Sequence, residues 1–188
     1  MSKAGLLLCG GQGSRFHGQV NKLVHPLGSS VVVEVSLAAM LGAGFDFNIV
    51  VDGAVDVGRY LAPGVVHVHN PDWINGMATS LKCGVEAAKR LGVDSLIVGL
   101  GDQPGIPASS WKAVGQSHGR PIAVATYHGK RRNPVRLDSS IWELLPESGD
   151  EGARALFRAY PELVEEVDCL GDPRDIDTLE DLIKWNNF

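Results

Sequence analysis

Residues 5–15 read GLLLCGGQGSR, an apolar strand-like run that opens directly into a glycine-rich turn. A turn of this kind exposes backbone N–H groups, which can bind phosphate. Arg15 and Lys22 follow the glycines and would supply positive charge. Glycines also occur here for a simpler reason, because they make tight turns that other residues cannot. The basic residues favour the nucleotide-binding interpretation.

Two well-known nucleotide-binding loops do not match this segment. The dinucleotide fingerprint Gly-x-Gly-x-x-Gly requires a glycine three residues after Gly13, where this chain has Phe16. A P-loop requires lysine and then serine or threonine after its last glycine, and here Gln19 and Val20 follow Gly18. The sequence therefore indicates a phosphate-binding loop of another type.

Length and charge limit the classes of protein to consider. The chain has 188 residues, 44% of them hydrophobic, and a net charge of −5 at pH 7. We expect a single domain spanning residues 1–188, and an acidic chain is not expected to bind nucleic acid or an anionic membrane. The N-terminal residues do not resemble a signal peptide, and no apolar run is long enough to span a bilayer. A cytoplasmic location is the expectation.

Cysteine and histidine spacing does not predict a metal site or a protein nucleophile. Cys9, Cys83 and Cys169 are far apart, so we expect reduced, mostly buried thiols. His67 and His69 have the spacing of ligands on a strand, but no third ligand is near in sequence, so zinc is not expected. Covalent hydrolase chemistry is not supported, because the chain has no Gly-x-Ser-x-Gly motif and Cys9 ends an apolar run.

Short runs rich in valine and isoleucine alternate with longer helical patterns. The sequence predicts strands at Ala4–Cys9, Phe47–Val51, Val65–His69, Ser95–Gly99, Ile122–Thr126 and Leu163–Val167. It predicts helices at Val31–Leu41, Met77–Leu91, Ala108–Gln116, Ser139–Leu145, Gly152–Ala159 and Thr178–Trp185, the first of them capped by Ser30. Such alternation is typical of the α/β class, with a parallel sheet covered by helices.

Open α/β sheets bind ligands beyond the carboxyl ends of their strands. The glycine loop follows the first predicted strand, Asp52 the second, Asn70 the third and Asp102 the fourth. We therefore expect a site assembled from these four strand ends.

Asp102 is the strongest candidate for a metal ligand. It follows an apolar run and lies between Gly101 and Pro104, which would fix it in a turn. Mg²⁺ binds one or two protein oxygens and completes its coordination with phosphate and water. Asp175 or Asp177 could give a second carboxylate, although residues before a helix also serve as caps. Asp102 could likewise be an ordinary turn residue.

Three further segments could bind a substrate. Residues 75–81 begin a helix with small and polar side chains, which lets a ligand approach the free N–H groups. Residues 131–134 and 149–154 place cations beside proline or glycine turns, where they could reach an anionic substrate or form a solvated surface loop. The loop, the fixed aspartate and the lack of an obvious nucleophile together suggest phosphoryl chemistry by positioning and charge neutralisation.

With these motifs, the chain resembles the MobA-like nucleotidyltransferases, most closely their molybdenum cofactor cytidylyltransferase branch. The resemblance spans nearly the whole length, in the same order. It rests on residues 8–16 with Lys22, residues 70–81, Gly101-Asp102-Gln103-Pro104, Asn133-Pro134-Val135, Gly149-Asp150-Glu151-Gly152-Ala153-Arg154 and Asp175-Ile176-Asp177-Thr178.

The resemblance implies a Rossmann-like three-layer sandwich of the nucleotidyltransferase type and an Mg²⁺-dependent reaction. Molybdopterin phosphate would attack the α-phosphorus of a nucleoside triphosphate and release pyrophosphate. The expected catalytic residues are Arg15, Lys22 and Asp102, with Asp102, Asp177 and Asp175 as metal ligands. Nucleotide binding is expected at Leu8, Cys9, Gly10, Gly11, Gly13, Ser14, Asp52, Asn70 and Ser80, and acceptor binding at Gly76, Met77, Asp150 and Arg154.

Several alternatives stay open from the sequence. The double glycine of the loop is more typical of the guanylyl branch, so both CTP and GTP are candidates, and a molybdoenzyme could receive the product. Other acceptors, such as phospholactate or a sugar phosphate, are the next alternative. A nucleotide-binding module without turnover and a Rossmann-type oxidoreductase are alternatives from other functional classes.

Overall fold

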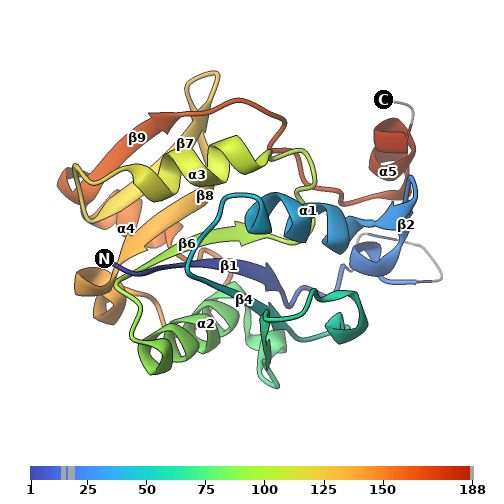
Figure 1. Ribbon diagram of the computed structural model, residues 1–188, viewed down its shortest axis with the longest axis horizontal. Helices are drawn as coiled ribbons and strands as arrows, with labels where there is room; N and C mark the ends of the chain where they lie inside the picture. Colours follow the sequence, from blue (N-terminus) through green and yellow to red (C-terminus); the bar gives the residue numbers. More distant parts are fainter. Residues whose placement is uncertain (14–15, 17–19, 187–188) are drawn as a thin grey trace.

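A seven-stranded sheet organises the computed structural model, which describes residues 1–13, 16 and 20–186 (Figure 1). The strands are β1 (Lys3–Cys9), β4 (Phe47–Asp52), β5 (Val66–His69), β6 (Ser95–Leu100), β7 (Ile122–Tyr127), β8 (Lys130–Asp138) and β9 (Val164–Asp168). Their order is β5-β4-β1-β6-β8-β7-β9, and only β8 runs antiparallel to its neighbours among the pairings of this sheet. Six of the seven strands were predicted from the valine- and isoleucine-rich runs, to within one or two residues at each end.

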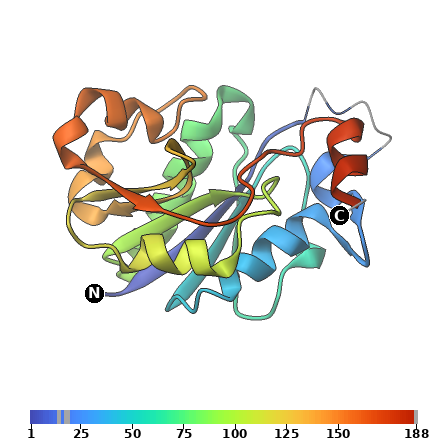
Figure 2. The same ribbon diagram turned by 90° about the horizontal axis from the view of Figure 1, so that it is seen from above.

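Helices cover both faces of the sheet and make three layers (Figure 2). One face carries α1 (Val32–Leu41) and α3 (Ala108–Gln116), and the other carries α2 (Met77–Leu91) and α4 (Arg154–Ala159). Alternate residues of β1 serve the two cores: Leu6 and Leu8 pack with the α2 side, and Leu7 and Cys9 with the α1 side. This period-two pattern is why β1 is apolar throughout, as expected for a central parallel strand. The mostly parallel α/β sandwich is therefore confirmed.

Four helix predictions need correction at an end or in type. The helix predicted at Gly152–Ala159 begins at Arg154, and the one predicted at Thr178–Trp185 spans Leu179–Asn186. Val31 pairs in a short strand, and α1 begins at Val32, because Glu34 accepts hydrogen bonds from the Val31 N–H at 3.1 Å and the Ser30 hydroxyl at 2.7 Å. Ser30 thus donates to Glu34 and is not itself the cap. The predicted helix at residues 139–145 is a 3₁₀ segment, η4 (Ser139–Leu144), whose start is capped by the Asp138 carboxylate.

The sequence did not predict β8, the antiparallel strand between β6 and β7. Three cations and a proline occur in its first half, which is the pattern of a solvated turn. In the structure, the register with β7 shifts between Val124–Val135 and Ala125–Arg132, so Asn133 and Pro134 lie in a bulge outside the ladder. The bulge lets a proline occupy an interior strand.

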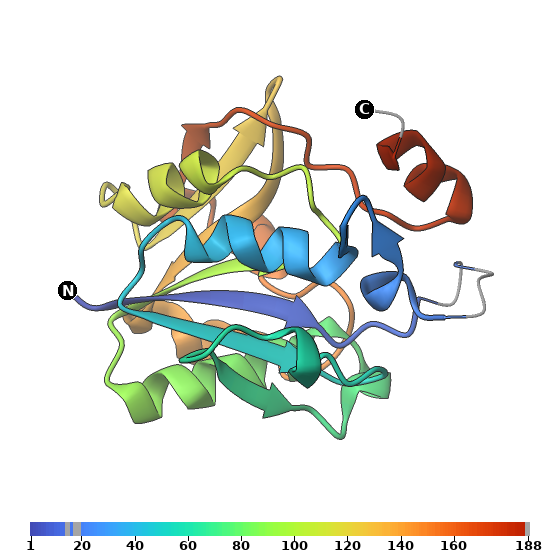
Figure 3. The same cartoon turned by 45° about the vertical axis from the view of Figure 1, so that its right-hand side comes forward.

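Distant parts of the chain meet beyond the carboxyl end of β1 (Figure 3). A small hairpin, β2 (Pro26–Leu27) and β3 (Ser30–Val31), follows the 3₁₀ segment η1 (Lys22–Val24), and α5 (Leu179–Asn186) packs beside it. A separate apolar cluster joins the two segments. It contains Phe16, Leu27, Val32, Ile176, Leu182 and Trp185. The C-terminal segment is thereby brought next to η1. The remaining short helical segments are η2 (Gly58–Tyr60), η3 (Trp73–Asn75) and η5 (Pro161–Leu163).

Within the described part of the chain, each helix is too short or too polar to cross a bilayer. All three cysteines are free, and Cys9 and Cys169 are buried, as the sequence predicted. Burial, together with the charges of Asp102 and Asp52, raises the pKa of the Cys9 thiol. Cys9 is therefore held protonated and unreactive at neutral pH.

Candidate active site

A cleft of about 490 Å³ opens beyond the carboxyl ends of β1 and β6. The glycine loop after β1 and Asp102 after β6 both line it. Of the sequence-predicted site residues, fourteen line it: Leu8, Cys9, Gly10, Gly11, Gly13, Lys22, Gly76, Met77, Ser80, Asp102, Asp150, Arg154, Asp175 and Asp177.

Lys22 lies at the centre of a charged cluster in this cleft. Its Nζ donates to Asp102 Oδ2 at 2.6 Å and to Asp177 Oδ1 at 3.0 Å. The lysine side chain is only 8% exposed. Burial alone would lower the pKa of Lys22, but the charges and hydrogen bonds of Asp102 and Asp177 outweigh burial and raise it. The ammonium group is therefore charged at neutral pH, and two carboxylates from distant segments accept its hydrogen bonds.

A second chain of hydrogen bonds fixes the neighbouring carboxylate. The Nε2 of Gln103 donates to Asp175 Oδ1 at 2.7 Å, and its Oε1 accepts from the Asn133 amide at 3.0 Å. Gln103 is 3% exposed and follows Asp102 in the same turn. The β8 bulge supplies Asn133, so the strand that the sequence did not predict helps to position Asp175.

The carboxylates of this cluster fit a divalent cation. Asp102 Oδ1 is buried and has no hydrogen-bond partner among the described residues, so its lone pairs are left for a ligand. Asp177 and Asp175 line the same cleft. Oxygen donors of this kind suit hard cations such as Mg²⁺ and Mn²⁺.

The opposite wall of the cleft combines the start of α2 with residues 149–154. The Ala78 N–H donates to the Gly149 carbonyl at 2.9 Å, and the Met77 N–H donates to Asp150 Oδ1 at 3.3 Å. Gly76 has φ +101°, and a Cβ there would lie 2.6 Å from the Gly149 carbonyl. The two segments that the sequence proposed for acceptor binding are therefore in direct contact.

A neighbouring pocket of about 330 Å³ continues from this wall. It shares Leu8, Met77, Leu100 and Arg154 with the cleft, and it is lined by both apolar side chains and arginines. Arg154 lies where the two spaces meet, so it could contact ligands in either.

Two of the predicted nucleotide-binding residues do not line the cleft. Asp52 is 1% exposed and its carboxylate contacts His67 and His69. Asn70 is also 1% exposed, and its amide donates to the hydroxyls of Thr79 and Ser80 at 2.9 Å. Asn70 therefore acts by positioning Ser80, which does line the cleft.

Gly10 is required for the close approach of the loop to Ser80. A Cβ at Gly10 would lie 2.6 Å from Ser80 Oγ, closer than atoms can pack without displacement. Ser14 and Arg15, which the sequence placed in the site, lie outside the described residues.

Five lining residues were not among the predicted site residues: Gln12, Leu23, Trp73, Ile74 and Leu100. Trp73 lies within residues 70–81, which carry part of the family resemblance, and Ile74 is 69% exposed beside it. Ile74 lies in η3 beyond the end of β5, and its place next to Trp73 in the sequence was the signal that could have identified it.

The family model of the MobA-like NTP transferase domain matches residues 5–165. The chain belongs to this family. A nicotine blue oxidoreductase of Paenarthrobacter nicotinovorans is 32% identical, with 96% of this chain and 94% of that protein covered. The purine catabolism protein PucB of Bacillus subtilis is 29% identical, with coverages of 94% and 92%.

Solved structures share this fold over nearly the full length of the chain. A nucleotidyl transferase from Methanothermobacter superposes with a TM-score of 0.85 at 22% identity and covers 99% of this chain and 96% of that one. Rv0371c of Mycobacterium tuberculosis, described as a complex with manganese, gives a TM-score of 0.81 at 23% identity, with coverages of 100% and 99%. Family and fold together support a nucleotidyltransferase.

Proposed function

We propose that this chain transfers a nucleoside monophosphate from CTP or GTP to the phosphate of a molybdopterin-type acceptor and releases pyrophosphate. The observation that carries the proposal is the buried Lys22, which lies against the glycine loop at Gly13 and donates to Asp102 and Asp177 in one cleft. A phosphate-binding loop beside a fixed cation and carboxylates is what phosphoryl chemistry by charge neutralisation requires.

Different residues of the chain would bind different parts of the triphosphate. The backbone N–H groups of the glycine loop bind phosphate oxygens, and the Lys22 ammonium neutralises charge on them. Arg15 is assigned the same role on the triphosphate. Leu8, Cys9 and Ser80 lie at the loop end of the cleft, where a nucleoside would contact them. In the reaction an oxygen of the acceptor phosphate forms a bond to the α-phosphorus of the triphosphate. The bond between the α-phosphorus and the oxygen that bridges it to the β-phosphorus breaks, and pyrophosphate leaves.

Asp102 and Asp177, with Asp175 beside them, would hold the divalent cation that the reaction uses. The unpartnered Asp102 Oδ1 supports this assignment, as does the manganese reported for Rv0371c. When bound, Mg²⁺ supplies charge neutralisation on the phosphates. The carboxylates would fix the position of the cation, because Gln103 hydrogen-bonds to Asp175 and Lys22 hydrogen-bonds to Asp102.

The acceptor would bind on the opposite wall, at Gly76, Met77, Asp150 and Arg154. Arg154 offers a guanidinium for an anionic group, and the adjoining pocket offers apolar surface for a ring system. The product would then pass to a molybdoenzyme.

A direct assay tests the proposal. The full chain is incubated with Mg²⁺, with CTP or GTP in separate reactions, and with molybdopterin, while pyrophosphate release is measured. Lys22→Met should abolish release, because the isosteric chain loses its charge, whereas Lys89→Met on the exposed side of α2 should not alter it. Phospholactate and a sugar phosphate serve as alternative acceptors. Absence of pyrophosphate with every triphosphate and acceptor would refute transferase activity.

A redox reaction is the second candidate, because a 32% identical relative is named a nicotine blue oxidoreductase. Thermal shift and absorbance measurements with NADH and NADPH separate the two functions. Stabilisation by a dinucleotide, without pyrophosphate release from any triphosphate, would favour the redox function.

A further inference from the structure

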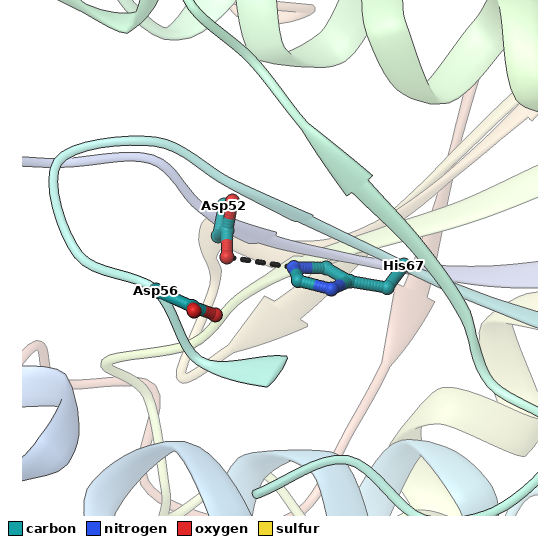
Figure 4. Close-up of side chains that lie close together, drawn as sticks. All are labelled: Asp52, Asp56 and His67. Atoms are coloured by element: carbon teal, nitrogen blue, oxygen red, sulfur yellow. Dashed lines mark hydrogen bonds and ion pairs between the residues drawn. The ribbon is translucent and has the colours of Figure 1, made fainter. Parts of the chain in front are cut away.

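A cluster of two aspartates and a histidine, Asp52, Asp56 and His67, lies outside the cleft, at the edge of the sheet formed by β4 and β5 (Figure 4), and His69 contacts it. Asp52 ends β4, Asp56 lies in the loop that follows, and His67 and His69 alternate on β5. Asp52 and His69 are register partners, so the sheet itself brings them together. No role in the proposed transfer reaction uses these side chains.

The centre of the cluster is a buried carboxylate. Asp52 is 1% exposed, and its Oδ2 lies 2.7 Å from His67 Nε2 while its Oδ1 lies 2.8 Å from His69 Nδ1. Oδ2 also accepts a hydrogen bond from the Val57 N–H at 3.1 Å. The two imidazoles are partly exposed, His67 by 35% and His69 by 60%. The cluster therefore has a buried carboxylate at its centre and imidazoles that solvent can reach.

We infer that Asp52, Asp56 and His67 form a binding site for a divalent transition metal of the Zn²⁺ class. One ligand atom from each of the three lies within 4.8 Å of the others, so a modest adjustment would let them share an ion. Imidazole nitrogen combined with carboxylate oxygen suits Zn²⁺ and similar metals, whereas Mg²⁺ prefers oxygen alone. His69 contacts the second oxygen of Asp52 and so orients this carboxylate, as residues that hydrogen-bond to metal ligands do.

Gly58 keeps the space between Asp56 and His67 open. A Cβ at this position would lie 3.0 Å from Asp56 Oδ1 and 3.1 Å from His67 Cε1. The Gly58 N–H also donates to Asp56 Oδ1 at 2.7 Å, which holds the exposed carboxylate toward the cluster. Any larger residue would push these two groups apart.

The loop that carries the proposed metal site is hydrogen-bonded to the glycine loop, so a bound metal would restrict movement of the glycine loop. The Ala54 N–H, in the loop between Asp52 and Asp56, donates to the Gly10 carbonyl at 3.3 Å. Gly53 packs against Trp73, which lines the cleft. A metal that joins this loop to β5 would restrain the loop that contacts Gly10, so we assign it a positioning role.

Zn²⁺ binding to the full chain tests the site directly. Titration calorimetry gives affinity and stoichiometry, and X-ray absorption reports whether imidazole is a ligand. The wild type should bind Zn²⁺ with an imidazole ligand and gain thermal stability from it. Asp56→Asn and His67→Gln should each weaken binding by about tenfold or more and remove that gain. Both replace exposed or partly exposed side chains, so folding should be preserved, which circular dichroism checks.

Matched controls separate this site from other carboxylates and histidines. His118→Gln removes an exposed imidazole from the α3–β7 loop and should leave Zn²⁺ affinity unchanged. Asp102→Asn alters the cleft cluster and should leave the imidazole-ligated Zn²⁺ in place, so the result does not depend on transferase activity. Wild-type affinity in folded His67→Gln, or no Zn²⁺ binding by the wild type at micromolar concentrations, would overturn the inference.

Discussion

Asp102 has two oxygens in different environments. Oδ2 accepts a hydrogen bond from Lys22 at 2.6 Å, and Oδ1 is buried without a hydrogen-bond partner among the described residues. An unpartnered buried carboxylate oxygen costs free energy unless a ligand binds it. At the scale of one residue, this atom is the strongest indication that the site works with a cation bound.

Asp102→Asn should therefore lower turnover much more than it lowers acceptor binding. The amide keeps an oxygen for Lys22 but loses the charge that holds the cation, so we expect kcat to fall on the order of a hundredfold or more. The KM for the acceptor should change by less than about threefold, because its binding residues lie on the opposite wall. Steady-state pyrophosphate assays at several acceptor concentrations give both constants.

Asp72→Asn is the matched control for this experiment. Asp72 is exposed, lies next to Trp73 and is not among the lining residues of the cleft. Its loss of charge should leave kcat unchanged. If Asp102→Asn retained the wild-type rate, the cation would have to bind elsewhere.

At the scale of elements, the sequence predicted strands better than it predicted their pairing. Runs such as Phe47–Val51 and Ser95–Gly99 are apolar on both faces, which identifies buried parallel strands without further information. The strand β8 begins with three exposed cations and has a proline at its centre, and its interior position depends on a bulge that only the pairing with β7 reveals. The strand-end rule located Asp102 correctly within the cleft.

The same rule placed Asp52 in the nucleotide site, whereas in the structure Asp52 does not line the cleft. Asp52 does follow a strand, but β5 lies beside it and brings His67 and His69 to its two oxygens. From the sequence alone no third ligand was recognised for the two histidines, because Asp52 and Asp56 lie more than ten residues before them. Contacts between neighbouring strands are the information that spacing in a single sequence lacks.

Glu165 on β9 ties three elements together and should make stability depend on pH. Its carboxylate accepts from the Gly119 N–H at 3.0 Å and lies 3.5 Å from the guanidinium of Arg136 on β8. Burial alone would raise the pKa of Glu165, but hydrogen bonds from the Ser117 side chain and the backbone at residues 119–120, with the charge of Arg136, lower it. A lowered folded-state pKa stabilises the fold above the unfolded-state value of 4.5 and loses that contribution as pH falls through the folded value.

Denaturant unfolding of Glu165→Gln and wild type at several pH values measures this contribution. At pH 7 the variant should be less stable by about 1 kcal/mol, and the difference should shrink below about pH 4.5. Glu166→Gln is the control, because its carboxylate is 51% exposed in a surface ion pair with Arg131 and should contribute less than about 0.5 kcal/mol. A difference between Glu165→Gln and wild type that stayed constant from pH 7 to pH 3 would contradict this account.

At the scale of the whole molecule, the cleft depends on the C-terminal segment folding back to the N-terminal loop. Lys22 and Asp177 are 155 residues apart in sequence, and their side chains meet at 3.0 Å. Behind this contact, the Gly28 N–H donates to Asn186 Oδ1 at 2.9 Å, and the Ile176 N–H donates to the Asp102 carbonyl at 2.9 Å. The site is complete only when α5 is docked.

Leu182→Ala tests this dependence at a distance from the cleft. Leu182 is 3% exposed and packs with Phe16, Val32 and Ile176 in the cluster that docks α5. Loss of its side chain should lower the free energy of unfolding by about 2–4 kcal/mol. It should also raise the KM for the triphosphate, because Asp177 precedes α5 and loses its fixed position beside Lys22. The neighbouring Ile183 is 59% exposed, so Ile183→Ala should change neither quantity appreciably. Denaturant unfolding and triphosphate titration of both variants decide the matter: a destabilised Leu182→Ala with wild-type KM would mean that the cleft forms without the docked helix.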